Sequence, residues 1–310
     1  MQETRRRVLD ALAEGPVPGP ELAERLDVSR AAVWKHVEAL REAGFGIEST
    51  DAGYRVIEVP AYGGLAVEFG LDAPFTVEYH GEIDSTNRRA RELAVEGASD
   101  VAVLAGAQTG GRGRLDREWS SPPGGVYLSV VCRPDLPTAH APVYTLAAAV
   151  AATRAAREAG VDAGIKWPND VLVPVGGEER KLVGILTEME GEADRVSWVL
   201  VGTGANVDVP ASELPGTATS LRELGADADR RAFAQRYLRA FEDLRSAPDS
   251  ILPAWREHTL TLGRRVRVET GSEVMEGEAV DVAFPGALLV ETDTGERRVS
   301  AGDCEHLRPI

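Results

Sequence analysis

Within residues 108–119 the chain reads QTGGRGRLDREW, and the interpretation of the whole sequence begins with this segment. Its glycines let the backbone approach a ligand closely and adopt positive φ angles. Its arginines offer planar, bidentate binding to phosphate or carboxylate, and Trp119 can stack on a base or cover an apolar ligand. We interpret the segment as a mobile loop that closes over an anionic nucleotide. By composition alone, a solvated Gly/Arg loop is the simpler interpretation.

The length and composition predict a multidomain globular protein without a membrane partner. The 310 residues are enough for two or three domains, and a hydrophobic content of 43% is ordinary. No apolar run reaches the roughly 18 residues of a membrane span, and the N-terminus lacks an apolar signal core. We therefore expect a cytoplasmic location. Two separated cysteines and scattered histidines predict neither a disulfide framework nor a metal site.

The charge is unusual in both size and kind. The formal net charge is −16, and the 34 basic residues comprise 31 arginines and 3 lysines. A strongly acidic chain does not usually bind nucleic acid through bulk charge. An acidic, lysine-poor composition rich in Ala, Gly and Arg indicates a halophilic source with a GC-rich genome. High salt would weaken long-range attraction to phosphate.

Residues 1–60 are predicted to form a winged helix-turn-helix DNA-binding domain. Apolar residues at helical spacing predict three helices, the third of which begins after Ser29 and ends at Gly44. A hairpin signal at 51–53 follows and supplies the wing. The third helix of such a module enters the major groove; a small interaction or dimerisation domain is the alternative. The residues expected to contact DNA are Ser29, Arg30 and Lys35 on the helix and Arg55 on the wing, with Arg41 on the same outward face.

The remainder is predicted to be an α+β domain followed by a small β-barrel. After a predicted linker at 58–64, residues 65–262 alternate strands and helices irregularly, which favours a mixed sheet over a doubly wound one. Residues 263–310 contain only strand signals with glycine-rich turns, as in a small barrel. The helices expected in the central domain are 85–96, 142–160, 229–246 and 248–258.

Four further polar clusters occur in the central domain. Residues 84–87 (DSTN) open a predicted helix, where hydroxyls and free N–H groups suit a polar ligand head, although an ordinary N-cap would look the same. Residues 166–170 (KWPND) and 181–186 (KLVGIL) place polar groups in apolar strands, and Gly184 leaves room for a ligand; a turn and an edge lysine are the alternatives. Residues 202–206 (GTGAN) predict close backbone approach to a ligand.

Taken together and in this order, the clusters make the chain resemble the bifunctional biotin–protein ligase and biotin-operon repressor family over essentially its whole length. The resemblance implies a central domain with the fold shared by biotin and lipoate ligases and a Src-homology-3-like C-terminal barrel. It implies that ATP, with Mg²⁺, activates biotin to biotinyl-5′-AMP, and that a lysine of a biotin carboxyl carrier protein accepts the biotin. Operator DNA is the second expected partner, and a homodimer is left open.

The resemblance also assigns roles to individual residues of this sequence. The positions that match biotin-binding residues are Ser85, Thr86, Gln108, Arg112, Gly184, Leu186 and Gly202. Those that match ATP- and adenylate-binding residues are Arg114, Arg117, Trp119, Asn169, Lys181 and Asn206. The expected catalytic residues are Lys181, Arg112 and Arg114, which neutralise charge, and Asp170, which would assist the incoming amine.

One departure and two alternatives accompany the resemblance. The loop carries Leu115-Asp116 where many relatives have a basic residue or Gly, and the acidic side chain lowers the positive charge of the loop. A lipoate or octanoate ligase of the same superfamily is an alternative, although the winged helix and the Gly-Arg loop argue against it. A ligand-sensing repressor with vestigial catalysis is the other; Lys181 and Arg114 argue against that one.

Overall fold

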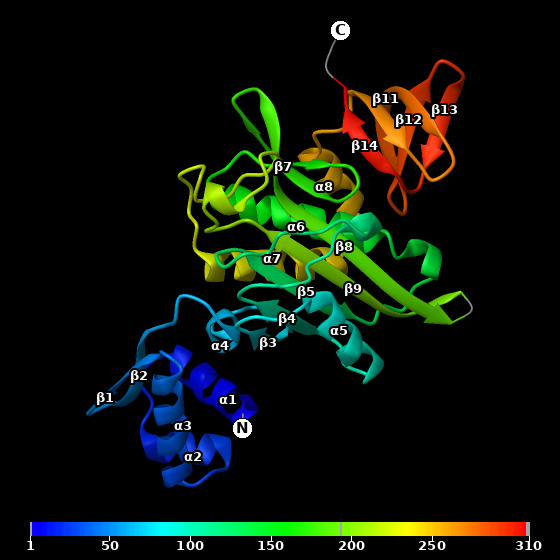
Figure 1. The fold of residues 1–310 in the computed structure, drawn as a ribbon. Helices are drawn as coiled ribbons and strands as arrows, with labels where there is room; N and C mark the ends of the chain where they lie inside the picture. The colour runs from blue at the N-terminus through cyan, green and yellow to red at the C-terminus, as the bar shows by residue number, and fades with distance from the viewer. Residues whose placement is uncertain (1, 193, 308–310) are drawn as a thin grey trace. The chain divides into compact units, whose positions relative to one another are not determined.

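The computed structural model describes residues 2–192 and 194–307, which divide into two compact units, Met1–Asp72 and Ala73–Ile310 (Figure 1). Each unit has its own core, so each is described by itself. No helix in the described ranges has the length and apolar character needed to cross a membrane. The domain boundaries predicted at 60, 65 and 262 stay predictions.

The first unit is a winged helix-turn-helix, as predicted. Val33, Val37 and Leu40 recur at helical spacing and are buried against residues of the first two helices. Ser29 caps the third helix, because its hydroxyl accepts the backbone N–H of Ala32 at 3.1 Å. The elements are α1 (Gln2–Ala13), α2 (Gly19–Leu26), α3 (Arg30–Glu42), β1 (Gly46–Thr50) and β2 (Gly53–Glu58).

The predicted linker at 58–64 leads into structure that the sequence did not predict. A short helix, α4 (Gly64–Glu68), begins at its end. Leu65 and Phe69 pack against the core of the first unit, and the ring of Phe69 meets that of Phe45 edge-on. These apolar residues therefore extend the first unit beyond its wing.

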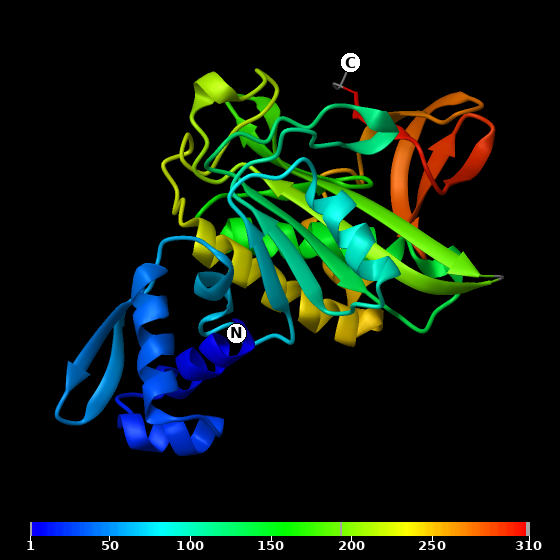
Figure 2. The same ribbon diagram turned by 60° about the horizontal axis from the view of Figure 1, so that its bottom comes forward.

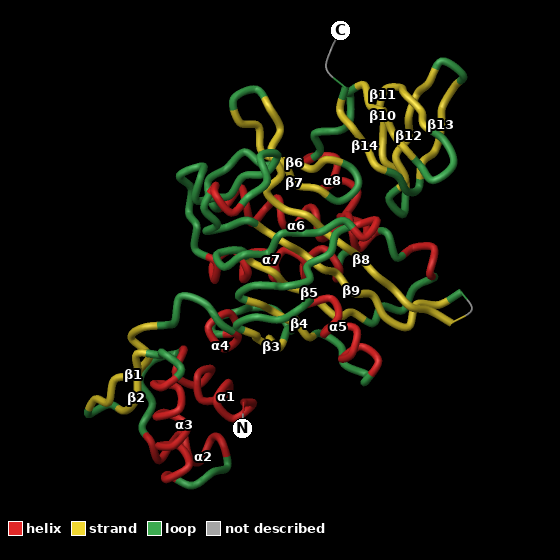
Figure 3. The backbone as a smooth tube through the Cα atoms, in the orientation of Figure 1, coloured by secondary structure: helices red, strands yellow, loops and turns green. Residues whose placement is uncertain are grey.

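The second unit is built on a seven-stranded mixed sheet with helices on both faces (Figures 1 to 3). Only β3 and β4 pair in parallel, and the strand order is β3-β4-β5-β9-β8-β7-β6. The strands are β3 (Thr76–His80), β4 (Val101–Ala105), β5 (Val126–Cys132), β6 (Gly164–Lys166), β7 (Asp170–Val175), β8 (Glu178–Glu192) and β9 (Arg195–Ala205).

The helices of this unit separate a structural face of the sheet from an open one. On one face, α6 is buried along most of its alanine-rich length, and α7 and α8 pack against it. On the other face, α5 covers only part of β4, β5 and β9, and it leaves the middle of β8 and β9 open to loops (Figure 2). The helices are α5 (Thr86–Val95), α6 (Val143–Glu158), α7 (Arg230–Ser246) and α8 (Ile251–His258).

The C-terminal segment forms a five-stranded antiparallel sheet in the order β13-β12-β11-β10-β14. Exposed and buried residues alternate along β10, so one face of this sheet has its own apolar core. Trp167 connects it to the central domain, because its indole N–H donates to the carbonyl of Gly286 at 2.9 Å. The strands are β10 (Arg265–Glu269), β11 (Val274–Ala283), β12 (Ala287–Thr292), β13 (Gly295–Val299) and β14 (Asp303–His306), of which β14 was not predicted.

Candidate functional site

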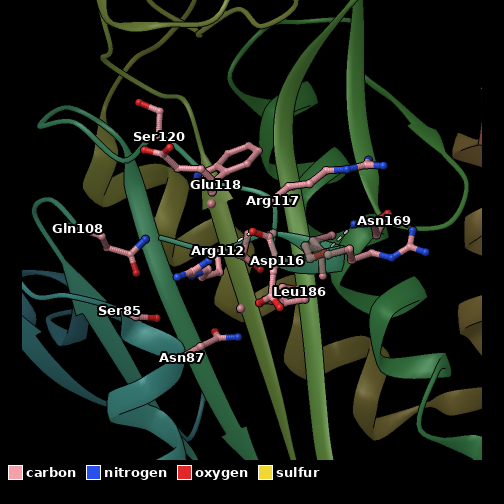
Figure 4. A pocket seen from close by; sticks show the side chains of 18 of the residues that line it. Ser85, Asn87, Gln108, Arg112, Asp116, Arg117, Glu118, Ser120, Asn169 and Leu186 are labelled. Carbon is pink, nitrogen blue, oxygen red and sulfur yellow. Dashed lines mark hydrogen bonds between the residues drawn. The ribbon is translucent and has the colours of Figure 1, made fainter. Parts of the chain in front are cut away.

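A pocket of about 790 Å³ lies on the open face of the large sheet, between the loop at 108–119 and the strands β8 and β9. Figure 4 places Ser85, Asn87 and Gln108 at one end of it and Arg117 and Asn169 at the other. Every residue that the sequence assigned to biotin, ATP or catalysis lines this pocket. Segments more than 100 residues apart in the chain therefore meet at one site.

The floor of the pocket is a pair of glycines covered by a tryptophan. Gly184 of β8 pairs with Gly204 of β9, and a Cβ on either residue would lie within 3 Å of the Trp119 ring. The space beside Gly184 that the sequence predicted is therefore occupied by Trp119. The indole Nε1 of Trp119 is buried and has no hydrogen-bond partner among the described residues. A buried donor of this kind can be satisfied by an acceptor on a ligand.

A chain of polar side chains closes one end of the pocket. Thr86 donates to Gln108 Oε1 from its backbone N–H at 2.8 Å and from its hydroxyl at 3.0 Å. Gln108 Nε2 donates to Ser121 at 3.0 Å. The hydroxyl of Ser129 lies 2.8 Å from that of Thr86 and 2.5 Å from Asn87 Oδ1. This network fixes donors and acceptors around the start of α5, where Ser85 is the N-cap.

Beyond Ser129 the network reaches a carboxylate that the sequence did not indicate. Asn87 Nδ2 donates to Glu188 Oε1 at 2.8 Å, and Arg91 forms an ion pair with the same carboxylate. Gly202 lies beside them, because a Cβ there would lie 2.1 Å from Asn87 Oδ1. Asn87 belongs to the polar cluster 84–87 that the sequence indicated, although no ligand-binding role was assigned to it. Nothing local to Glu188 could have indicated that residue.

Lys181 and Asp170 form an ion pair in the middle of the pocket. Lys181 Nζ lies 2.7 Å from Asp170 Oδ1 and 5.0 Å from the centroid of the Trp119 ring. A cation on an aromatic face gains from the ring quadrupole, so the two contacts hold the ammonium group at a defined position. An anionic ligand entering the pocket would meet this ammonium group beside a carboxylate.

The loop that carries the arginines is a tight hairpin. Trp119 N–H donates to Gly111 at 3.0 Å, and Gly113 N–H donates to Arg117 at 2.8 Å. Arg114 donates to Asn169 Oδ1 at 3.0 Å, while Arg117 forms an ion pair with Asp303 of β14. Arg112 is exposed, and its one hydrogen bond to the described residues goes to the backbone carbonyl of Asp116, at 3.3 Å. The arginines therefore differ in how firmly they are held.

Two predicted phosphate or ribose ligands also support the local fold. Asn206 is only 2% exposed, and its Nδ2 donates to the carbonyl of Thr219 at 3.1 Å. Asn169 Nδ2 donates to the carbonyl of Ile185 at 2.8 Å. Each amide thus has its donor engaged, whereas Asn169 offers Oδ1 to Arg114. Residues absent from the sequence prediction also line the pocket: Leu214, Pro215, Thr217, Ala218 and Asp303.

In the first unit, the residues expected to contact DNA divide into free and engaged groups. Arg30 and Lys35 are exposed on α3, and neither has a hydrogen bond or ion pair within the described chain. Trp34 is 55% exposed between them. Arg55 lies 3.5 Å from Glu48 in a surface pair. Arg41 donates to the carbonyl of Ile47 at 2.7 and 2.9 Å, so this side chain connects α3 to the wing.

Family models match all three parts of the chain. Residues 81–206 match the biotin/lipoate A/B protein ligase family, residues 4–55 match an HTH domain, and residues 261–307 match the biotin protein ligase C-terminal domain. Within the described ranges, no group of three or more His, Cys, Asp or Glu side chains could hold a metal ion. The matches cover the winged helix, the pocket and the C-terminal sheet in the order observed.

Similar proteins extend over nearly the whole length. The chain is 37% identical to the bifunctional ligase/repressor BirA of Bacillus subtilis, with 93% of each protein covered. It is 32% identical to the protein of the same name from Escherichia coli, covering 93% of this chain and 92% of that protein. The structure of a biotin protein ligase from Aquifex aeolicus in complex with biotin and ATP matches with a TM-score of 0.61 and 27% identity, covering 75% of this chain and 99% of that one.

Proposed function

The chain belongs to the family of bifunctional biotin protein ligases and repressors, and from that premise we propose that it activates biotin with ATP and transfers it to a protein lysine. One observation carries the proposal: a polar end that suits an uncharged ligand head and a cationic end that suits phosphates belong to one pocket. The biotin head would contact Ser85, Thr86 and Gln108. Its tail would extend along Gly202, Leu186 and Gly184 toward Lys181 and Arg114.

In the first step, a carboxylate oxygen of biotin attacks the α-phosphorus of ATP. The bond from that phosphorus to the bridging oxygen breaks, and pyrophosphate leaves. Both reactants are anions, so catalysis consists of positioning and charge neutralisation. Lys181, Arg112 and Arg114 would supply the cations, with Mg²⁺ arriving on the nucleotide. The Trp119 ring, now lying on Gly184 and Gly204, would shift to cover the adenine.

In the second step, the lysine amine of the acceptor attacks the acyl carbon of biotinyl-5′-AMP, and the bond to AMP breaks. The nitrogen must lose a proton to act as a nucleophile. Asp170 is a carboxylate in the pocket that is held beside the cation Lys181, by an ion pair of 2.7 Å. We assign it the role of orienting the amine and receiving that proton. The acceptor would be a biotin carboxyl carrier domain.

The winged helix gives the ligase its regulatory half. Arg30 and Lys35 project from α3 without partners in the described chain, which leaves their charges for the phosphates of operator DNA. Ser29, the N-cap, places an N–H-rich helix start beside them, and Arg55 extends the basic surface to the wing. Because the bulk charge of the chain is −16, binding would depend on these few cations.

Further expectations rest on composition and on the family. A cytoplasmic location is part of the proposal, and the arginine-rich, acidic composition favours a halophilic source. A homodimer on operator DNA agrees with the two-fold symmetry of most repressor sites. None of these changes the chemistry assigned to the pocket.

The proposal is tested by incubating the full chain with biotin, ATP and Mg²⁺. Mass spectrometry should find biotinyl-5′-AMP and one pyrophosphate released for each adenylate. Addition of a biotin carboxyl carrier domain should then yield a single biotinylated lysine. Lipoate in place of biotin provides the matched comparison. Adenylation of lipoate in preference to biotin, or of neither compound, would refute the assignment.

A further inference from the structure

The tip of the arginine loop adopts a backbone conformation that its side chains disfavour. Leu115 and Asp116 both have φ of 56°, in the left-handed region that favours glycine. Leu115 is also 73% exposed, so burial of its side chain does not compensate for the conformation. Strained residues persist where surrounding contacts determine the backbone. The compensating contacts are made by the residues that flank the turn.

Both flanking residues are held by the C-terminal sheet. Arg114 Nη2 donates to the carbonyl of Gly302 at 2.8 Å, and its Nη1 lies 3.9 Å from Asp303 Oδ1. Arg117 donates to the other oxygen of the same carboxylate. Residues 302 and 303 thus hold the two ends of the strained turn at one point. The contacts join parts of the chain 186 and 188 residues apart.

The point to which the loop is held is itself well fixed. Asp303 is the first residue of β14 and pairs with Glu269 of β10. A Cβ on Gly302 would lie 2.8 Å from the carbonyl oxygen of Glu269, so only glycine fits this approach without a shift of the backbone. The sheet is held to the central domain through Trp167 and the carbonyl of Gly286. The loop is therefore held by a strand that is itself fixed by backbone pairing and by the Trp167 contact.

Arg114 shows what this arrangement achieves at the pocket. Its guanidinium contacts Gly302 on one side and Asn169 on the other, where Nη1 donates to Oδ1 at 3.0 Å. It lines both the main pocket and a smaller cavity of about 290 Å³ bordered by Lys166 and Asp303. A cation held from two sides keeps its direction before a ligand arrives, which is the condition for electrostatic preorganisation.

We propose that Asp303 is a positioning residue: together with Gly302 it braces the strained Leu115-Asp116 turn and keeps Arg114 directed into the pocket. The part of this inference that concerns nucleotide binding rests on the proposed function. The part that concerns the position of the loop does not. Asp116 lowers the positive charge of the loop, which weakens the charge attraction that could hold it over an anionic ligand. In this chain the C-terminal sheet sets the position of the loop through Asp303, at the edge of the pocket.

The first experiment needs no ligand. Chymotrypsin cleavage after the exposed Leu115 should be about fivefold faster in Asp303→Asn than in wild type, because loss of a partly exposed ion pair shifts such an equilibrium by about this factor. Asp293→Asn, an exposed substitution on the same sheet, is the matched control and should leave the rate unchanged. Equal cleavage of the two variants would overturn the proposal.

A double-mutant cycle with Arg117→Gln separates the brace from a general loosening of the sheet. If Asp303 acts through Arg117, the double variant should be cleaved no faster than the faster of the two single variants. Multiplied effects of the two changes would instead show that they act independently, against the proposal. The Asp303→Glu variant should be cleaved more slowly than Asp303→Asn, because it keeps the charge.

The second experiment measures the effect of Asp303 on nucleotide binding. In Asp303→Asn, KM for ATP should rise about threefold and biotinyl-5′-AMP should dissociate faster, with kcat changed less, because the residue touches the loop and not the reacting atoms. Tighter binding of ATP would show that Asp303 competes with the nucleotide for the arginines and would reject the brace. A wild-type protein that makes no adenylate would refute the proposed function, while the cleavage experiment would still test the brace.

Discussion

The cations of the pocket and those of helix α3 are the same residue types in opposite circumstances. In the pocket, Lys181 is paired with Asp170, and Arg114 is bound to Asn169 and Gly302. On α3, Arg30 and Lys35 project from the surface with no partner in the described chain. Lys181 and Arg114 are thus positioned before the ligand arrives, whereas Arg30 and Lys35 are not held by any contact in the described chain.

This difference has consequences that can be measured. A positioned cation acts on geometry, so its replacement should lower the rate of the chemical step and depend little on salt. A free surface cation acts through counterion release, so its replacement should lower affinity and change the salt dependence. Reversed outcomes in the two regions would invalidate the comparison.

The largest effect is expected at Lys181. Lys181→Ala should reduce the rate of biotinyl-5′-AMP formation by about 10²- to 10³-fold, because it removes the ammonium group beside the reacting phosphate. Lys181→Arg should also be strongly impaired, since the longer side chain with its planar, delocalised charge cannot place a compact ammonium group at the position of Nζ beside Asp170. The rate of pyrophosphate release is the measurement for both variants. Arg195→Ala, on the surface at the start of β9, is the control, and a fully active Lys181→Arg enzyme would contradict the geometric argument.

A smaller effect is expected on α3. There the salt dependence of DNA binding should distinguish a basic residue that contacts phosphate from one that holds the fold. Lys35→Gln should weaken operator binding and reduce the salt slope, −d log K/d log[salt], by about 0.9 if it loses one phosphate contact. Arg41→Gln should leave the slope unchanged and instead lower the melting temperature of the first unit, because Arg41 holds the wing through Ile47. Fluorescence anisotropy over a salt series measures the first effect and calorimetry the second. Equal slopes for wild type and Lys35→Gln would remove Lys35 from the interface.

The fold and most of the pocket were accessible from the sequence because their signals are local. Helical spacing, the N-cap at Ser29 and the glycines at 184, 202 and 204 are patterns within a few residues, and the winged helix, the mixed sheet and the C-terminal sheet followed from such patterns. The relative placement of separate clusters came from the family resemblance, not from any pattern within them.

The remainder depends on contacts between distant segments, which no local pattern contains. Asp303 meets Arg117 across 186 residues, and Trp119 fills the space that Gly184 was expected to leave for a ligand. Arg41 looked like a DNA contact, because spacing places it on the outward face of α3 but does not reveal its bonds to Ile47. In each case the sequence showed the type of residue but gave no signal for the residue that it contacts.

The smallest effect concerns the attachment of the C-terminal sheet, on which the pocket side of the comparison depends. His306 of β14 is buried with Nε2 3.0 Å from the Thr261 hydroxyl and Nδ1 2.8 Å from Glu179 Oε2. The Thr261 hydroxyl already accepts the Trp167 backbone N–H at 2.9 Å, so its own proton is available for Nε2. The neutral ring, with its proton on Nδ1 toward Glu179, therefore satisfies both of these contacts.

Burial lowers the pKa of His306, with Glu179 opposing the shift and nearby Arg264 and Lys166 adding to it. In the unfolded chain the histidine has its ordinary pKa of about 6.5, whereas in the folded protein the pKa is lower. As pH falls through about 6.5, the unfolded chain therefore binds the proton first. The free energy of unfolding should therefore fall as pH decreases from about 7 through that value, with a drop in Tm of about 2 °C in calorimetry. His306→Gln should reduce this dependence; the part that remains would come from His258 and His36, whose pKa values burial also lowers. After normalisation to the cleavage of a peptide substrate at each pH, which corrects for the titration of the protease itself, chymotrypsin cleavage after Leu115 should rise as pH falls in wild type. It should rise less in His306→Gln, because the loop is braced by the strand that carries this histidine. A cleavage rate independent of pH would separate the attachment of the sheet from the position of the loop.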